Sequence, residues 1–109
     1  MCVYKIEEIA EKVRPIAERY GIAKVYLFGS YARGQATEES DIDLLVDDEN
    51  IKGLFKLGGL YSDLEDVLQK EIDLVTFGQI EQNRDNPLHK RFIQEVELDR
   101  KEIYSAFVK

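Results

Sequence analysis

The sequence predicts an α/β fold with an α+β arrangement, in which helices cover a mixed sheet of a few strands and one sheet face stays open. Two observations lead to this prediction. Short segments rich in β-branched and aromatic residues alternate with longer segments whose apolar residues are spaced by three and four. The length of 109 residues suits one compact domain, so we expect residues 1–109 to form a single domain.

Three strands and three longer helices are expected. The predicted strands are residues 22–28, 41–46 and 71–77. The predicted helices are residues 3–20, 54–68 and 88–107, the last with a break near residues 98–100. A short helix or turn is expected from Ser30, and the polar residues 78–87 are expected to form a loop. Each amphipathic helix has an apolar face to bury, which provides the cover of the sheet.

The charge balance narrows the classes of ligand. Lysine and arginine number 15 against 22 aspartates and glutamates, which gives a formal net charge of −7. Nucleic-acid binding relies on basic patches, so direct binding of DNA or RNA is not expected. The acidic balance still permits a nucleotide whose phosphates are neutralised by metal ions.

Rare residue types exclude further classes. A single cysteine, Cys2, rules out an internal disulfide and a cysteine-cluster metal site, and a single histidine, His89, disfavours a histidine-rich zinc site. No apolar run approaches the roughly 20 residues of a membrane helix, and the start of the chain lacks the apolar region of a signal peptide. We therefore expect a cytoplasmic protein without membrane contact.

Three aspartates are the candidate metal ligands. Asp43 and Asp73 occupy the same place in two Ile-Asp-Leu segments, 42–44 and 72–74. Because side chains alternate across a strand, Asp41 and Asp43 share the face opposite the apolar residues, and Asp73 lies likewise. Such carboxylates repel one another unless cations lie between them, and Mg²⁺ favours these oxygen ligands. Asp73 alone is equally well explained as a solvent-facing residue, so the other two carry most of the argument.

A glycine-serine turn is the candidate phosphate site. The segment GSYARG, residues 29–34, directly follows the first predicted strand. Gly29 permits close approach to the backbone, and a helix beginning at Ser30 would aim its N–H groups at a phosphate. The segment lacks the Gly-Lys-Ser/Thr ending of a P-loop, and an ordinary turn with an N-cap would also explain it. Arg33 could contact phosphate or brace the loop through a salt bridge, and we favour the bracing role.

Together these motifs resemble a known family. The segments FGSYARG at 28–34 and SDIDL at 40–44 are similar to the signature of the minimal nucleotidyltransferases, in the DNA polymerase β-type nucleotidyltransferase superfamily. The resemblance implies the small nucleotidyltransferase fold. It also implies that the catalytic residues and ligands of two Mg²⁺ ions are Asp41, Asp43 and Asp73, and that the triphosphate of ATP is held by Gly29 and Ser30. The third aspartate would also help to deprotonate the acceptor.

The resemblance further implies an activity and a partner. It implies an antitoxin that transfers AMP from ATP to a tyrosine hydroxyl of a partner toxin, a ribonuclease of the higher eukaryotes and prokaryotes nucleotide-binding (HEPN) type. Two alternatives stay open: neutralisation of a toxin by binding alone, or modification of a small molecule such as an aminoglycoside in a pocket completed by a second subunit. Exposed apolar residues of the last helix could supply a surface for a partner or for a homo-oligomer.

Overall fold

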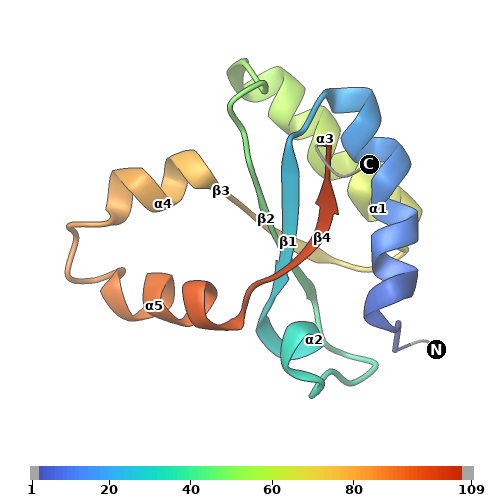
Figure 1. The fold of residues 1–109 in the computed structure, drawn as a ribbon, viewed down its shortest axis with the longest axis horizontal. Helices are drawn as coiled ribbons and strands as arrows, with labels where there is room; N and C mark the ends of the chain where they lie inside the picture. Colours follow the sequence, from blue (N-terminus) through green and yellow to red (C-terminus); the bar gives the residue numbers. More distant parts are fainter. Residues whose placement is uncertain (1–2, 107–109) are drawn as a thin grey trace.

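A four-stranded mixed sheet organises residues 3–106, the part of the chain that the structure, a computed structural model, describes (Figure 1). The strands are β1 (Lys24–Phe28), β2 (Ile42–Val46), β3 (Ile72–Thr76) and β4 (Lys101–Ser105). The helices are α1 (Ile6–Tyr20), α2 (Gly29–Arg33), α3 (Gly53–Leu68), α4 (Phe77–Asn83) and α5 (Lys90–Asp99). The strands lie in the order β3-β2-β1-β4. This arrangement confirms the predicted fold class.

Strand pairing places two of the candidate aspartates in one row across the sheet. β1 is antiparallel to β2 and β4, whereas β2 and β3 are parallel and are joined through α3. The register pairs Phe28 with Asp43, and Asp43 with Asp73. One row across three strands therefore carries the end of β1 and two of the candidate aspartates.

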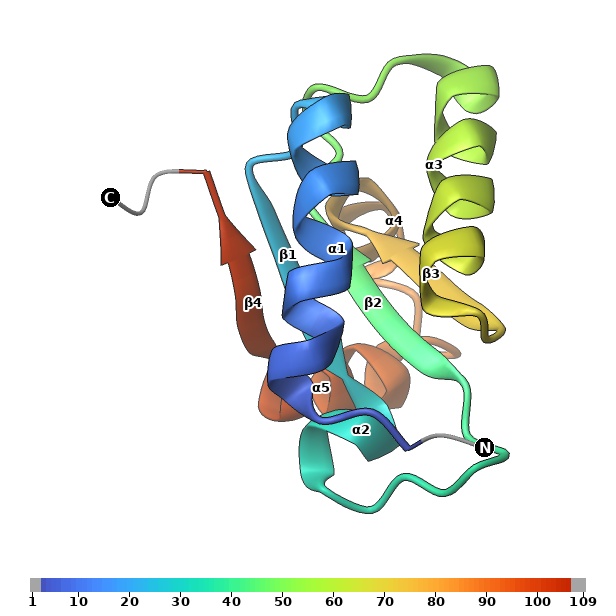
Figure 2. The same ribbon diagram turned by 90° about the vertical axis from the view of Figure 1, so that its right-hand side faces the viewer.

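The main core lies between the sheet and a layer of two helices. α1 and α3 cover one face of the sheet, as Figure 2 shows. Apolar residues of these helices, including Ile9, Val13 and Leu64, belong to one buried cluster with alternate residues of β2 such as Ile42 and Leu44. Burial of such a side chain is worth about 1.5–3 kcal/mol, so this cluster holds the two layers together.

Within residues 3–106, no helix combines the length and the apolar character needed to span a membrane.

The second face of the sheet was expected to stay open, but it is covered by α4 and α5, which lie on the side opposite α1 and α3 (Figure 1). A smaller buried cluster joins them to the sheet, and it consists of Phe28, Leu45, Ile80, Ile93 and Val96. β2 thus packs Ile42, Leu44 and Val46 against the first layer of helices and Leu45 against the second. The cover leaves cavities beside the row of aspartates.

The predicted loop at residues 78–87 was wrong, because its first part belongs to α4. A capping box begins this helix: Gln79 N–H donates to the Thr76 hydroxyl, and Thr76 N–H donates to Gln79 Oε1. These reciprocal bonds satisfy backbone donors that the first turn cannot pair internally. The Thr-x-x-Gln signal was present in the sequence, but Gly78 and the polar composition concealed it.

The predicted helix at residues 88–107 was wrong beyond its break. α5 ends at Asp99, the backbone becomes extended at Arg100, and residues 101–105 form β4 against the edge of β1. Pairing with a free sheet edge outweighs the weak helical spacing of these residues. Phe107, assigned to the same predicted helix, lies outside the described residues.

Candidate active site

Gly29 and Ser30 form the start of α2, directly after β1. Gly29 has a φ of +75°, in the left-handed region that favours glycine, and it packs against the Asp43 carboxylate. A Cβ added at Gly29 would overlap Asp43 Oδ2 and would lie 2.9 Å from Asp43 Cγ. Glycine is therefore required here both for the backbone conformation and for the room that Asp43 occupies.

Asp43 is the central member of the predicted acidic group. Burial, followed by the negative charges of Asp73 and Asp41, raises the pKa of Asp43 to about 6, and Arg33 acts in the opposite direction. Asp73 is its register partner on the next strand, and Asp41 immediately precedes β2. Asp41 and Asp73 are exposed, whereas Asp43 is partly buried. The three carboxylates thus lie close enough to interact electrostatically.

A cavity of about 280 Å³, here named the Asp43 cavity, joins the glycine-serine turn to two of the aspartates. Its lining residues are Phe28, Gly29, Ser30, Arg33, Asp43, Asp73, Phe92, Glu95, Val96 and Asp99. Four of the five predicted site residues therefore meet at one place. The fifth, Asp41, is outside this lining and influences the cavity through its charge on Asp43.

α5 contributes residues that reasoning from the sequence did not single out. Phe92, Glu95 and Asp99 lie at helical spacing and line the Asp43 cavity. The ring of Phe92 meets that of Phe28 edge to face, with the centroids 6.1 Å apart. The spacing was readable in the sequence, but the position of the helix over the site is set by its packing on the second sheet face.

Arg33 braces α2 against α5. Its guanidinium donates from Nη1 to Asp99 Oδ2 at 2.6 Å and from Nε to Gln35 Oε1 at 3.2 Å. The Asp99 side chain is only 19% exposed, so this ion pair is better shielded from water than a fully exposed one. The contact is the bracing role favoured from the sequence.

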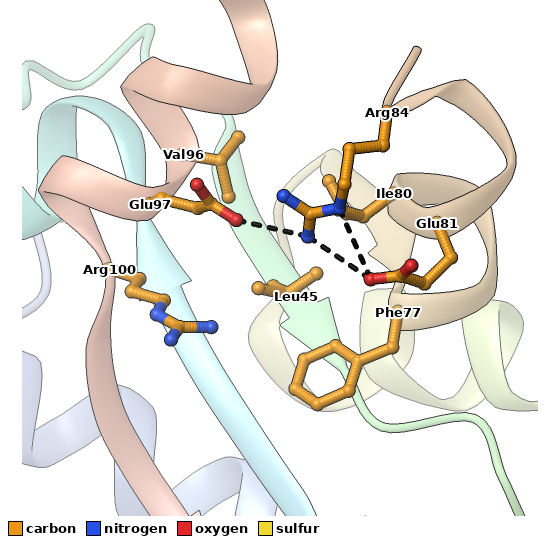
Figure 3. Close-up of a pocket in the computed structure, with 8 residues that line it drawn as sticks. All are labelled: Leu45, Phe77, Ile80, Glu81, Arg84, Val96, Glu97 and Arg100. Carbon is orange, nitrogen blue, oxygen red and sulfur yellow. Dashed lines mark hydrogen bonds and ion pairs between the residues drawn. The ribbon is translucent and has the colours of Figure 1, made fainter.

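A second cavity, of about 240 Å³, lies between α4 and α5 over β2 (Figure 3). The Arg84 guanidinium contacts Glu81 at 3.1 Å and Glu97 at 3.2 Å, and so links the two helices. The Arg100 guanidinium lies over the ring of Tyr26, 4.8 Å from its centroid. The Arg84 ion pairs therefore connect α4 with α5, and the Arg100 contact connects the end of α5 with β1.

The donor set beside Gly29 suits a hard cation that arrives with phosphate. Within residues 3–106, no three or more histidine, cysteine, aspartate and glutamate side chains are already gathered as a metal-binding cluster. Mg²⁺ needs fewer, because it typically takes one or two carboxylates and completes its shell with phosphate oxygens and water. Asp43 and Asp73, adjacent in register and mutually repulsive, provide such a pair.

Comparison with known proteins identifies the class of enzyme. The sequence profile of the nucleotidyltransferase domain family matches residues 6–99, so the chain belongs to the nucleotidyltransferase family. A solved minimal nucleotidyltransferase is 31% identical to it, with a TM-score of 0.67, and the match covers 93% of this chain and 98% of that one. The chain is thus a minimal nucleotidyltransferase, which confirms the resemblance seen in residues 28–34 and 40–44.

Two further proteins extend the comparison. MntA of Thermococcus cleftensis, a protein adenylyltransferase, is 40% identical over 79 residues, which cover 69% of this chain and 80% of MntA. The solved complex of a tri-AMPylated HEPN toxin from Shewanella oneidensis with an MNT antitoxin matches with a TM-score of 0.62 at 20% identity. That match covers 93% of this chain and 73% of the other, and at this identity it shows a shared fold.

Proposed function

We propose that this chain is an antitoxin that uses ATP and Mg²⁺ to transfer AMP to a tyrosine hydroxyl of a HEPN-type toxin. One observation carries the proposal: Gly29 and Ser30 line the same cavity as Asp43 and Asp73. A turn suited to phosphates thus adjoins carboxylates suited to the cations that accompany them. The activity of MntA supports AMP as the transferred group, and the Shewanella complex supports a HEPN toxin as acceptor.

Each predicted site residue has a part in this reaction. Gly29 and Ser30 hold the triphosphate of ATP. The side chains that would hold the metal ions are Asp41, Asp43 and Asp73. When bound, two Mg²⁺ ions would neutralise the charge on the attacking and leaving oxygens of the displacement.

The transfer is an in-line displacement at the α-phosphorus of ATP. The tyrosine oxygen bonds to this phosphorus while the bond from phosphorus to the bridging oxygen of pyrophosphate breaks, and pyrophosphate leaves with the electron pair. Asp73 accepts the proton of the tyrosine hydroxyl. Such reactions depend on positioning and charge neutralisation, so they need no nucleophilic side chain from the enzyme.

The charge of the chain favours a basic partner. A formal net charge of −7 would speed its encounter with a positively charged surface and disfavour an RNA acceptor. We propose that residues 1–109 act in the cytoplasm as one domain and that the toxin itself presents the acceptor tyrosine.

AMP transfer is tested directly with ATP labelled at the α-phosphate, Mg²⁺, the chain and a HEPN toxin that binds it. We expect label on the toxin with the wild-type chain, and no label with the double variant Asp41→Asn and Asp43→Asn, which lacks two metal-binding carboxylates. Absence of label under conditions where the wild-type chain and toxin bind would refute the proposal.

Toxin activity in the same samples separates transfer from masking. The double variant is expected to bind the toxin and to leave its ribonuclease activity in place once the two proteins are separated, whereas toxin treated with wild-type chain stays inactive. Full neutralisation by the double variant at equal protein concentration would show that binding alone suffices.

Binding of Mg²⁺-ATP is expected to strengthen as the pH rises through about 6. Below the Asp43 pKa of about 6 the protonated carboxyl cannot hold a cation, so affinity falls about tenfold for each pH unit. Since the proton and Mg²⁺ compete for one group, a higher Mg²⁺ concentration shifts the midpoint to lower pH. Titration calorimetry between about pH 5 and pH 8 measures both effects, and affinity that does not change with pH would contradict them.

A further inference from the structure

A third cavity adjoins the Asp43 cavity on the far side of Asp73. It has a volume of about 250 Å³ and is here named the β3 cavity. Its lining residues are Asp73, Leu74, Val75, Gln79, Ile80, Asn83, His89, Phe92 and Ile93. Asp73 and Phe92 line both cavities, so the two spaces meet at these side chains.

The order of the strands places Gly29, Asp43 and Asp73 along one line across the sheet. Gly29 follows β1, Asp43 lies on β2 and Asp73 on β3, and these strands are neighbours in that order with the two aspartates in register. Neighbouring strands lie about 4.8 Å apart, so the three positions form successive steps across the sheet. The β3 cavity continues this line beyond Asp73, away from Gly29.

The geometry of an in-line displacement indicates from which end of this line the acceptor oxygen approaches. The attacking and leaving oxygens lie on opposite sides of the phosphorus. With the leaving pyrophosphate at Gly29 and Ser30 and the α-phosphate beside Asp43, the acceptor oxygen must approach from the side of Asp73. The β3 cavity is the space that opens on that side.

The lining of the β3 cavity suits an aromatic side chain with a polar end. Ile80 and Ile93 are buried beneath it, and Phe92, 40% exposed, presents an aromatic ring. Asn83 and His89 add polar groups, and the Asn83 amide is held by donation to the Gln79 carbonyl at 2.9 Å. Tyrosine combines an apolar ring, which packs on such a surface, with a hydroxyl that the carboxylate of Asp73 can accept from.

We propose that the β3 cavity binds the ring of the acceptor tyrosine and directs its hydroxyl past Asp73 to the α-phosphorus of ATP. This proposal rests on the proposed function and adds its acceptor subsite. Phe92, Asn83 and His89 are then residues that bind the acceptor, with Phe92 at the boundary between acceptor and nucleotide.

Filling the β3 cavity tests the assignment. Asn83→Trp places a large side chain in this cavity and outside the lining of the Asp43 cavity, and Gln82→Trp is its control, an exposed neighbour on α4 that lines neither. We expect Asn83→Trp to raise the KM for the HEPN toxin by about tenfold or more and to leave the dissociation constant for Mg²⁺-ATP unchanged. The control variant should leave both quantities unchanged.

A second variant and a binding measurement guard against misfolding of the first. His89→Trp fills the cavity from the residue that caps the start of α5, at an exposed position, and should have the same effect on KM. In NMR spectra of the wild-type chain with Mg²⁺ and a non-hydrolysable ATP analogue, N-acetyltyrosinamide should shift the amide signals of Asn83 and His89 and leave that of Gln82 unchanged.

The outcomes separate the two proposals. A matching loss of ATP affinity in the filled variants would assign the β3 cavity to the nucleoside and overturn the acceptor assignment, as would an unchanged KM in both. A wild-type chain that transfers no AMP would refute the proposed function and the acceptor subsite together. Normal transfer by wild type and by both filled variants would refute the subsite alone.

Discussion

Asp43→Asn is expected to reduce AMP transfer by about 10³-fold while stabilising the folded chain above pH 6. Activity falls because the amide removes one negative ligand from the place where charge must be neutralised, and the loss of one such electrostatic group commonly costs about 10²–10³-fold. The radiolabel assay at saturating ATP measures this loss. The variant is expected to be more stable because, in the chain without metal, the charged Asp43 carboxylate is unfavourable in the folded state and the neutral amide removes that charge.

The sign of the stability change comes from the pKa of Asp43. The folded chain raises that pKa from 3.8 to about 6, so between these values the folded state binds more protons than the unfolded state, and stability decreases as the pH rises. Because Asp43 is partly exposed, water screens the repulsion. We therefore expect the raised pKa to lower the free energy of unfolding of the wild-type chain by about 1–2 kcal/mol at pH 8. Asparagine is neutral throughout, so the variant escapes this loss.

Urea denaturation at about pH 4 and pH 8 measures the effect. The stability of Asp43→Asn relative to wild type should be greater at pH 8 than at pH 4. Asp85→Asn is the control, because Asp85 is exposed and lines none of the three cavities described, and it should change neither activity nor stability. A variant less stable than wild type at pH 8 would contradict this, because it would show that the charged Asp43 carboxylate stabilises the folded chain instead of destabilising it.

Gly29→Ala is expected to reduce transfer by about 100-fold through displacement of Asp43. The added methyl would overlap the Asp43 carboxylate, and the neighbouring backbone belongs to the start of α2, so the carboxylate is the group that moves. A misplacement of about 1 Å in a catalytic group can cost about 10²-fold in rate. Steady-state transfer rates and Mg²⁺-ATP affinity both report the displacement.

Gly34→Ala supplies a control with the same backbone strain and no clash. Gly34 has a φ of +76°, against +75° at Gly29, and a Cβ there would meet no atom within 4 Å. Both variants should lose about 1 kcal/mol of stability from the left-handed conformation, but only Gly29→Ala should lose activity. Equal losses of activity would attribute the effect to strain at the ends of α2 rather than to contact with Asp43.

The strands and the main core could be predicted from local patterns. The three predicted strands contain β1, β2 and β3, and the faces of α1 and α3 follow their apolar spacing. β4 could not be predicted in this way, because residues 101–105 become a strand through pairing with β1, a partner distant in sequence. α4 depended on a short capping signal within polar surroundings.

Some residues of the candidate site could likewise be predicted from local sequence, and others could not. Gly29, Ser30 and the aspartates were predicted because a strand end, a turn and side-chain alternation are local features of the sequence. Phe92 and Asn83 were not, because their place beside Asp73 depends on how α4 and α5 pack on the second face. Residues on helices that pack over a site can be recognised as site residues only from the tertiary structure.

The parallel pairing of β2 with β3 makes the catalytic centre dependent on a completed crossover. Parallel neighbours cannot be joined by a tight hairpin, and here the connection runs through α3, which packs against α1. Asp43 and Asp73 come together only when that long loop has closed. An unfinished or partly unfolded chain therefore lacks the paired carboxylates on which the proposed transfer depends.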